Sequence, residues 1–271
     1  MQTALVTGAS SGIGRATSLE LGRRGYHVIA AGRSPRRIGR VVAAIIDGGG
    51  SAEPSIFDLG SLVSTAETAG ILAGSGRDLD VLVNNAGVGG ARGVTEDGFE
   101  IHFGVNHLGH FLLTSQLAGS LRTGSRVVTV SSEMHHRVDG IDFDSLRAPG
   151  RSFFGLREYA VSKLANILFT RELARRRPDL ACNAVHPGLA NTRIIPAYLR
   201  PFLALRSLSA EEAANTVIWC ATRGEAAADS GRYYIRREAH EPSPAARDDG
   251  LARELWHRSE SWCEATTGIG N

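Results

Sequence analysis

The sequence predicts an α/β protein with a doubly wound, mainly parallel sheet of about seven strands between two layers of helices. Three observations lead to this prediction. Short β-rich runs alternate with longer helical stretches, glycine accounts for 32 of 271 residues, and 42% of the residues are hydrophobic. Alternating strands and helices are typical of a parallel sheet covered on both faces. The glycines indicate many tight turns, and the apolar content is sufficient for a large core.

The expected elements follow one another along the chain. Strands are predicted at Thr3–Thr7, His27–Ala31, Pro54–Phe57, Val81–Asn84, Arg126–Ser131, Cys182–Val185 and Arg232–Ile235. Helices are predicted between them, at Gly12–Arg24, Arg36–Asp47, Leu62–Ala73, Phe99–Leu121, Gly155–Arg177 and Ala210–Thr222. The last of these begins with a capping box, Ser209-Ala-Glu-Glu212. In such a sheet, ligands bind beyond the carboxyl ends of the strands.

The chain reads as one domain over residues 1–271, because no linker or internal repeat divides it. Two long segments interrupt the alternation. Residues 133–154 are polar, and residues 189–208 carry prolines and large apolar side chains, which favours a substrate lid there. Residues 236–271 form a C-terminal extension with a short amphipathic helix, expected to dock on the core or to cover the pocket.

Charge and cysteine content exclude several classes of function. The 30 basic and 28 acidic residues give a net charge of +2, too balanced for a nucleic-acid or anionic-membrane binder. The three cysteines lie far apart, which argues against a disulfide framework. No histidine or carboxylate motif indicates a metal site. We expect no signal peptide or membrane anchor, and a cytoplasmic protein.

A glycine-rich loop, Thr7-Gly8-Ala-Ser-Ser-Gly12-Ile-Gly14, lies between the first predicted strand and the first predicted helix. Glycine lets backbone N–H groups approach a pyrophosphate closely, and the helix N-terminus supplies partial positive charge. The strand before and the helix after are the context that this function requires. The loop therefore predicts a Rossmann-type dinucleotide site.

The end of the second strand bears on the choice of cofactor. An NAD site usually places an acidic residue there to bind the ribose 2′-hydroxyl. This chain instead has Arg33, followed by Arg36 and Arg37, with no carboxylate. Because arginine can form a fork onto a 2′-phosphate, the sequence favours NADP(H) over NAD.

Tyr159-x-x-x-Lys163 provides the candidate catalytic pair. Both residues lie in a predicted helix, and i,i+4 spacing places their side chains on one face. A nearby ammonium favours the phenolate and lowers the pKa of tyrosine. Of the 30 basic residues, 29 are arginine and only residue 163 is lysine. Such a bias suggests that this position requires an ammonium, although a half-exposed surface pair is the ordinary alternative.

The spacing Gly-x-x-x-Gly-x-Gly, the Tyr-x-x-x-Lys pair and several further motifs resemble the short-chain dehydrogenase/reductase family over nearly the whole chain. This resemblance implies a catalytic tetrad. Its members would be Asn106, Ser132, Tyr159 and Lys163, with Ser131 the competing serine. It also implies the cofactor-binding residues Gly8, Ser10, Ser11, Gly12, Ile13, Gly14, Arg33, Asp58, Leu59, Asn85, Ala86, Gly87, Tyr159, Lys163, Pro187, Gly188 and Thr192.

The family resemblance implies a mechanism as well. Hydride would pass between nicotinamide C4 and a carbonyl carbon while Tyr159 gives or takes the proton on oxygen. Ser132 would hold that oxygen, and Lys163 would lower the Tyr159 pKa and bind the nicotinamide ribose. Asn106 would support a water relay to the lysine.

The segments around Phe103-Gly-Val-Asn-His-Leu-Gly-His-Phe and Tyr159–Thr170 resemble the retinol-dehydrogenase-like branch. This resemblance implies a lipophilic ketone, aldehyde or alcohol as substrate. The residues expected to contact it are Ser132, His135, Phe153, Tyr159, Ile194 and Tyr198. Reduction of an activated C=C bond and non-catalytic NADP sensing are the alternatives. The family often forms dimers and tetramers, so a homodimer or homotetramer is open, as is a monomer.

Overall fold

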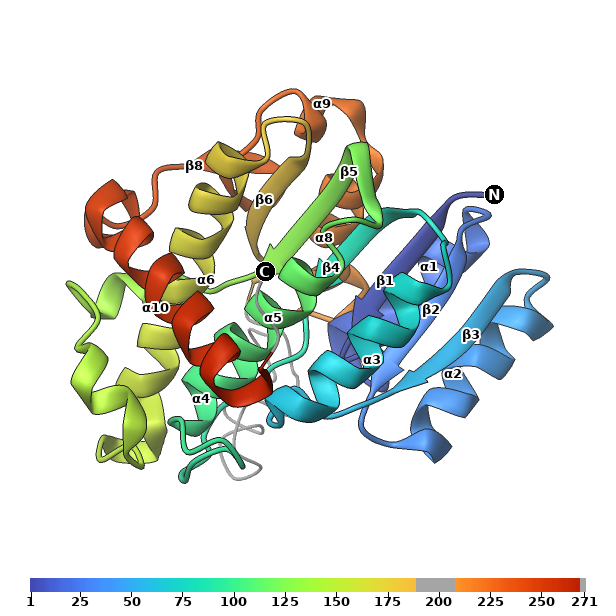
Figure 1. Cartoon of the computed structure of the whole chain (residues 1–271). Helices are drawn as coiled ribbons and strands as arrows, with labels where there is room; N and C mark the ends of the chain where they lie inside the picture. The colour runs from blue at the N-terminus through green and yellow to red at the C-terminus, as the bar shows by residue number, and fades with distance from the viewer. Residues whose placement is uncertain (189–207, 269–271) are drawn as a thin grey trace.

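The computed structural model describes residues 1–188 and 208–268. Its centre is an eight-stranded sheet in the order β3-β2-β1-β4-β5-β6-β7-β8 (Figure 1). The strands are β1 Thr3–Thr7, β2 His27–Gly32, β3 Ser51–Ile56, β4 Leu79–Asn84, β5 Leu121–Val130, β6 Ala181–His186, β7 Tyr233–Ile235 and β8 Glu238–His240. All pairings are parallel except the last, β7 with β8. This is the expected Rossmann-type fold.

The strand order reverses between β1 and β4, so their following loops diverge and leave a crevice at the carboxyl edge. The buried strands explain this arrangement, because β1, β4 and β6 are buried along their whole length and therefore need cover on both faces. Both the glycine-rich loop and the Asn84-Asn-Ala-Gly87 turn lie at this edge.

Helices cover the two faces of the sheet (Figure 1). They are α1 Gly12–Arg23, α2 Pro35–Asp47, α3 Leu62–Gly74, α4 Ile101–Phe103, a π-helix Gly104–Leu108, α5 Gly109–Gln116, α6 Leu156–Arg176, α8 Ala210–Thr222, α9 Gly224–Ala227 and α10 Asp249–Thr267. Short 3₁₀ turns occupy Glu133–Arg137, Phe143–Arg147, Phe153–Gly155 and Ala245–Arg247. One apolar core lies between the sheet and α3, α5, α6 and α10, and a second lies beneath α1, α2 and α8.

Two elements differ from the sequence-based prediction. The single helix expected over Phe99–Leu121 is divided into α4, the π-helix and α5, and Leu121 already belongs to β5. An eighth strand follows the seventh through a turn in which Arg236 and Arg237 have φ of 50° and 70°. Turns of this type normally carry Asn-Gly, so two arginines gave no signal for a hairpin.

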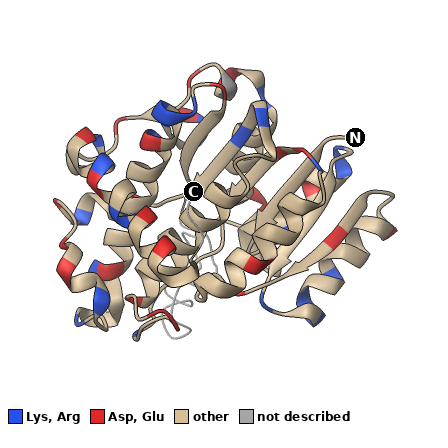
Figure 2. Ribbon diagram, viewed as in Figure 1, with Lys and Arg blue, Asp and Glu red and all other residues tan. Residues whose placement is uncertain are grey.

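The C-terminal extension supplies α10, which packs against α6 and α3. Its buried face includes Leu255, Trp256 and Cys263, and the Trp256 ring stacks on Phe169 with centroids 5.8 Å apart. The lid predicted at 189–208 lies outside the described residues except for Leu208. Basic and acidic side chains are interspersed over the drawn elements (Figure 2), in line with the small net charge. Among the described helices, none has the length and apolar character that crossing a membrane requires.

Candidate active site

The glycine-rich loop packs directly on the turn that follows β4. Gly8 has φ of +67°, and a Cβ there would lie 2.8 Å from Ala86 Cα. At Gly14 a Cβ would lie 2.4 Å from the Gly8 carbonyl oxygen. Ser11 begins α1 without capping it through its side chain, and the first turn of α1 has no acidic residue. The close packing and the uncapped helix N-terminus fit a pyrophosphate-binding cradle.

Hydrogen bonds fix the two loops to each other. The Thr7 hydroxyl accepts from the backbone N–H groups of Asn85 and Ala86, with distances of 2.9 and 3.0 Å. The Asn85 amide donates in return to the Thr7 carbonyl at 2.8 Å. The structure therefore brings Gly8, Gly14, Asn85 and Ala86 together at one place, as the sequence analysis expected for a cofactor site.

The end of β2 carries exposed positive charge. Arg33 lies 3.6 Å from the Asp58 carboxylate, with two-thirds of its side chain exposed. A hollow of about 230 Å³ is lined by Ser10, Arg15, Arg37, Arg40 and Val41. Within the described part of the chain, none of these three arginines forms an ion pair, so their guanidinium groups are free to bind an anion. The sequence analysis missed Arg15, which only the fold brings to Arg37, and Arg40, which the i,i+3 spacing on α2 already places beside Arg37.

Tyr159 and Lys163 lie one turn apart on α6. Lys163 is buried, its Nζ lies 5.5 Å from the Tyr159 ring centroid, and it donates to the Val130 carbonyl at 3.0 Å. Burial lowers the pKa of Lys163 to about 8. Burial also raises the pKa of Tyr159 to about 12, and a hydrogen bond with the Ser132 side chain acts in the opposite direction. We expected Lys163 to lower the Tyr159 pKa, but in the protein alone burial has the larger effect.

The two adjacent serines point to different partners. The Ser131 hydroxyl donates to the Lys163 carbonyl at 2.7 Å and is buried. Ser132 begins the 3₁₀ turn at Glu133, accepts weakly from the Met134 N–H at 3.3 Å, and contacts Tyr159. Of the two candidates, Ser132 is therefore the one whose hydroxyl shares a site with the tyrosine.

Asn106 lies in the π-helix, where the chain makes wider turns that often mark functional sites. Its side-chain amide accepts from the Val88 N–H at 2.8 Å and donates to the Val88 carbonyl at 3.1 Å and the Ser162 hydroxyl at 2.9 Å. A Cβ on Gly87 would lie 3.1 Å from Asn106 Oδ1 and 3.8 Å from Lys163 Nζ. Asn106 is thus beside the lysine and holds the end of the β4 loop.

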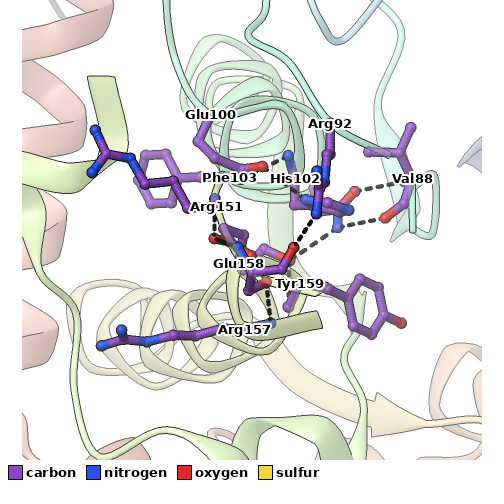
Figure 3. Close-up of polar contacts among 12 residues, drawn as sticks. Val88, Arg92, Glu100, His102, Phe103, Arg151, Arg157, Glu158 and Tyr159 are labelled. Carbon is purple, nitrogen blue, oxygen red and sulfur yellow. Dashed lines mark hydrogen bonds and ion pairs between the residues drawn. The ribbon is translucent and has the colours of Figure 1, made fainter. Parts of the chain in front are cut away.

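A second polar network, not expected from the sequence, lies behind Tyr159 (Figure 3). Buried Glu100 accepts from His102 Nδ1 at 2.8 Å and from the backbone N–H of His102 and Phe103. The His102 ring lies edge-on to the Tyr159 ring with centroids 6.1 Å apart. The Tyr159 ring extends away from these bonds (Figure 3), which leaves its hydroxyl to Ser132.

The segment before Tyr159 is clamped to the β4 loop. Glu158 accepts from the backbone N–H of Arg151 and Ser152, and from the Ser152 hydroxyl. Arg92 donates to the Ser152 carbonyl at 3.0 Å. Figure 3 shows these residues gathered at the N-terminus of α6. These contacts fix the approach of the chain to Tyr159.

The residues expected to contact the substrate divide into three groups. Phe153 is 73% exposed and packs on Phe154. His135 has no exposed surface, donates from Nδ1 to the Ser132 carbonyl, and accepts at Nε2 from the Ser243 N–H. With both nitrogens bonded inside the protein, His135 holds the C-terminal segment and offers no surface to a substrate. Ile194 and Tyr198 lie outside the described residues, as does the cofactor candidate Thr192.

The remaining cofactor candidates occupy varied surroundings. Asp58 is half-exposed beside Arg33, while Leu59 is buried and its carbonyl would meet a side chain on Gly109. Gly188 follows β6 with φ of +88°. Within residues 1–188 and 208–268, no three His, Cys, Asp or Glu side chains form a group that could hold a metal ion.

Comparison with known proteins identifies the family of the chain. Residues 2–143 match the family model for short chain dehydrogenase. Human retinol dehydrogenase 14 is 40% identical over 291 residues, which covers 96% of this chain and 85% of that protein. The chain is therefore a member of the short-chain dehydrogenase family and an oxidoreductase. Within the family, it is similar to the retinol-dehydrogenase-like branch.

Solved structures show the same architecture. A putative uncharacterized protein from Mycobacterium Paratuberculosis is 34% identical, with a TM-score of 0.82 over 97% of this chain and 94% of that one. A short chain dehydrogenase from Burkholderia cenocepacia J2315, solved in complex with NADP, is 28% identical with a TM-score of 0.71. That comparison covers 86% of this chain and 94% of the other.

Proposed function

We propose that this protein is an NADP-dependent oxidoreductase that interconverts a lipophilic ketone or aldehyde and its alcohol, with Tyr159 as the general acid or base. The observation that carries the proposal is the meeting of Tyr159, Ser132 and Lys163 beside the glycine-rich loop. Tyr159 contacts Ser132, and Lys163 is buried one helical turn away. These groups match the needs of proton transfer to a carbonyl oxygen next to a nicotinamide.

The residues present fit a dinucleotide. The loop from Gly8 to Gly14 would hold the pyrophosphate, because any side chain there would fill the space against Ala86 and Gly8. Arg33 and the arginines of the hollow would hold a 2′-phosphate. Lys163 would contact the nicotinamide ribose. The sequence motifs assign Asn85–Gly87, Pro187, Gly188 and Thr192 to the same cofactor. NADPH, when bound, supplies the hydride.

The protein's own groups handle the proton. A tyrosine phenol is protonated at neutral pH, and burial raises the pKa of Tyr159 further, so the phenol is ready to donate to the substrate oxygen during reduction. Ser132 would hold that oxygen by a hydrogen bond. The Lys163 ammonium would stabilise the phenolate that remains after the proton has moved. In the oxidative direction the same groups act in reverse, with the phenolate as base.

The proposal is tested by NADPH oxidation against a panel of lipophilic ketones and aldehydes. Tyr159→Phe should retain NADPH binding, but its turnover rate should be lower by about 10²–10⁴-fold, because the substitution removes the proton donor and keeps the aromatic ring. Binding is measured by NADPH fluorescence and turnover by absorbance. Turnover retained in this variant would overturn the role given to Tyr159.

Product analysis separates the proposal from the other reactions. An alcohol product supports carbonyl reduction, whereas a saturated carbonyl product would identify a C=C reductase. Binding of NADPH with no turnover across the panel would favour a cofactor sensor.

A further inference from the structure

A chain of hydrogen bonds connects the glycine-rich loop to Asn106 through His110, a residue that the proposed mechanism does not use. His110 lies on α5 and is 1% exposed. Its Nε2 lies 2.8 Å from the Thr7 hydroxyl, and its Nδ1 lies 3.0 Å from the Asn106 carbonyl oxygen. The side chain therefore spans the distance between the loop that would hold the cofactor and the helix turn that holds a member of the tetrad.

The chemistry of the two partners fixes the direction of these bonds. A backbone carbonyl only accepts, so Nδ1 carries the hydrogen. Burial lowers the pKa of His110 to about 4, so the ring is neutral near pH 7 and Nε2 is an acceptor. The Thr7 hydroxyl then donates to Nε2 at 2.8 Å, in preference to the Val83 carbonyl at 3.2 Å.

At the Thr7 end, the bond to His110 orients the hydroxyl. A hydroxyl has one hydrogen and two lone pairs. With its hydrogen directed to His110, the Thr7 oxygen presents its lone pairs to the N–H groups of Asn85 and Ala86. His110 thus favours the hydroxyl orientation that holds the β4 loop against Gly8.

At the Asn106 end, the bond to His110 supports the π-helix. The wide turns there use i→i+5 bonds, such as that from the Gly109 N–H to the Gly104 carbonyl. His110 lies four residues after Asn106, and its Nδ1–H donates a hydrogen bond to the Asn106 carbonyl. The Asn106 side chain is then placed to bond Val88 (Figure 3) and Ser162, and Ser162 donates to the Tyr159 carbonyl at 2.7 Å.

We propose that His110 is a positioning residue that couples the phosphate-binding loop to the catalytic tetrad. Its two bonds make the placement of the Thr7–Gly14 loop and of Asn106 depend on each other. The proposal rests on the proposed function for its effect on turnover, but the coupling itself concerns contacts within the protein. It therefore predicts a structural effect that is measurable without any substrate or cofactor.

Three substitutions of His110 test its hydrogen bonds to Thr7 and to Asn106 separately. His110→Phe keeps an aromatic ring and removes both. His110→Asn places a donor at the δ position, so it can satisfy the Asn106 carbonyl but falls short of Thr7. His110→Gln carries an amide that can reach both partners, with N–H toward Asn106 and oxygen toward Thr7. His107→Phe is the matched control, because His107 is equally buried one turn earlier but bonds Ser259 on α10 instead.

NADPH affinity and kcat are measured for each variant at a temperature where circular dichroism shows a folded protein. His110→Phe should weaken NADPH binding and lower kcat, each by about tenfold or more, since two buried partners lose their bonds. His110→Gln should recover most of both. His110→Asn should bind NADPH more weakly than His110→Gln, and His107→Phe should keep both properties near wild type.

Several outcomes would overturn the coupling. One is wild-type affinity and kcat in folded His110→Phe, and another is an equal loss in His107→Phe. If His110→Phe does not fold, equal NADPH affinity for His110→Asn and His110→Gln would serve the same purpose, because it would show that the bond to Thr7 is not needed.

Amide hydrogen exchange of the protein alone keeps this test separate from the proposed function. Protection of residues 84–88 should fall in His110→Asn relative to His110→Gln, and should stay at the wild-type level in His107→Phe. Unchanged protection of residues 84–88 in His110→Asn would overturn the coupling. Wild-type protein that turns over no carbonyl would overturn the proposed function alone.

Discussion

At the scale of the residue, Lys163 predicts a dependence of activity on pH. Burial lowers its pKa to about 8, so the ammonium is present below that pH and is lost above it. If the ammonium binds the cofactor ribose and stabilises the Tyr159 phenolate, kcat/KM for NADPH should be level below pH 8. Above pH 8 it should fall by up to about tenfold per pH unit.

The matched variant for this pH profile is Lys163→Arg, which keeps its charge at every accessible pH. Its activity should be lower, since the guanidinium differs in shape, but the fall near pH 8 should be absent. An unchanged fall in Lys163→Arg would assign the titration to another group.

Arg37 distinguishes the two nicotinamide cofactors in our proposal. It lines the hollow beside Ser10 and has no ion-pair partner among the described residues, whereas the neighbouring exposed Arg36 is not part of that lining. Arg37→Ser should raise KM for NADPH by about tenfold, because a charged hydrogen bond to a phosphate is lost. KM for NADH should be unchanged.

Arg36→Ser controls for the loss of one positive charge from the same helix. Steady-state kinetics with both cofactors measure the effect. Equal changes in KM for NADPH and NADH in Arg37→Ser, or equal effects of the two arginine variants, would contradict a 2′-phosphate site at Arg37.

At the scale of the element, the start of α6 depends on a glycine. Gly155 has φ of +65°, and a Cβ there would lie 2.5 Å from His102 Cε1 and 2.7 Å from the Ala91 carbonyl oxygen. Gly155→Ala should lower the free energy of unfolding by about 1–3 kcal/mol and reduce kcat, because the first turn of α6 must move with Tyr159. Urea unfolding and steady-state kinetics measure the two effects.

Gly39→Ala is the control for this substitution. Gly39 lies inside α2, where a Cβ would meet nothing within 4 Å. Alanine there should stabilise the protein by up to about 1 kcal/mol, as expected for a helix interior. If Gly155→Ala behaved like Gly39→Ala, the close packing of His102 against α6 would have no energetic consequence.

At the scale of the whole molecule, buried histidines make the fold sensitive to acid. Burial lowers the pKa of His107 to about 3 and of His110 to about 4. The unfolded chain therefore binds more protons between pH 6.5 and about 4, and the free energy of unfolding falls as the pH falls through this range. Each histidine should cost about 2 kcal/mol at pH 5 relative to pH 7.

Urea unfolding at pH 7, 6 and 5 measures this dependence. His107→Phe should flatten the slope by about one proton, because the aromatic ring remains but cannot be protonated. His240→Phe, at an exposed position on β8, should leave the slope unchanged. An unchanged slope in His107→Phe would place the acid sensitivity elsewhere.

Local patterns were sufficient for most of the fold. The alternation of apolar runs gave seven of the eight strands and the order of the helices, because a two-sided parallel sheet imposes that alternation directly on the sequence. The glycine-rich loop and Tyr159-x-x-x-Lys163 also depend on spacing within one segment. The hairpin of β7 with β8 was missed because its Arg236-Arg237 turn lacks the usual residues.

By itself, the sequence determined the fold class and the two short motifs on which the proposed chemistry depends, the glycine-rich loop and Tyr159-x-x-x-Lys163. Only the tertiary structure decided which of two adjacent serines faces Tyr159, that His135 is sealed inside the protein, and that Arg15, Arg37 and Arg40 share one hollow. It also decided the protonation state of the candidate pair, because burial shifts the pKa of Tyr159 and of Lys163. Burial, packing and contacts between distant segments arise when the whole chain folds, and no short stretch of sequence contains them.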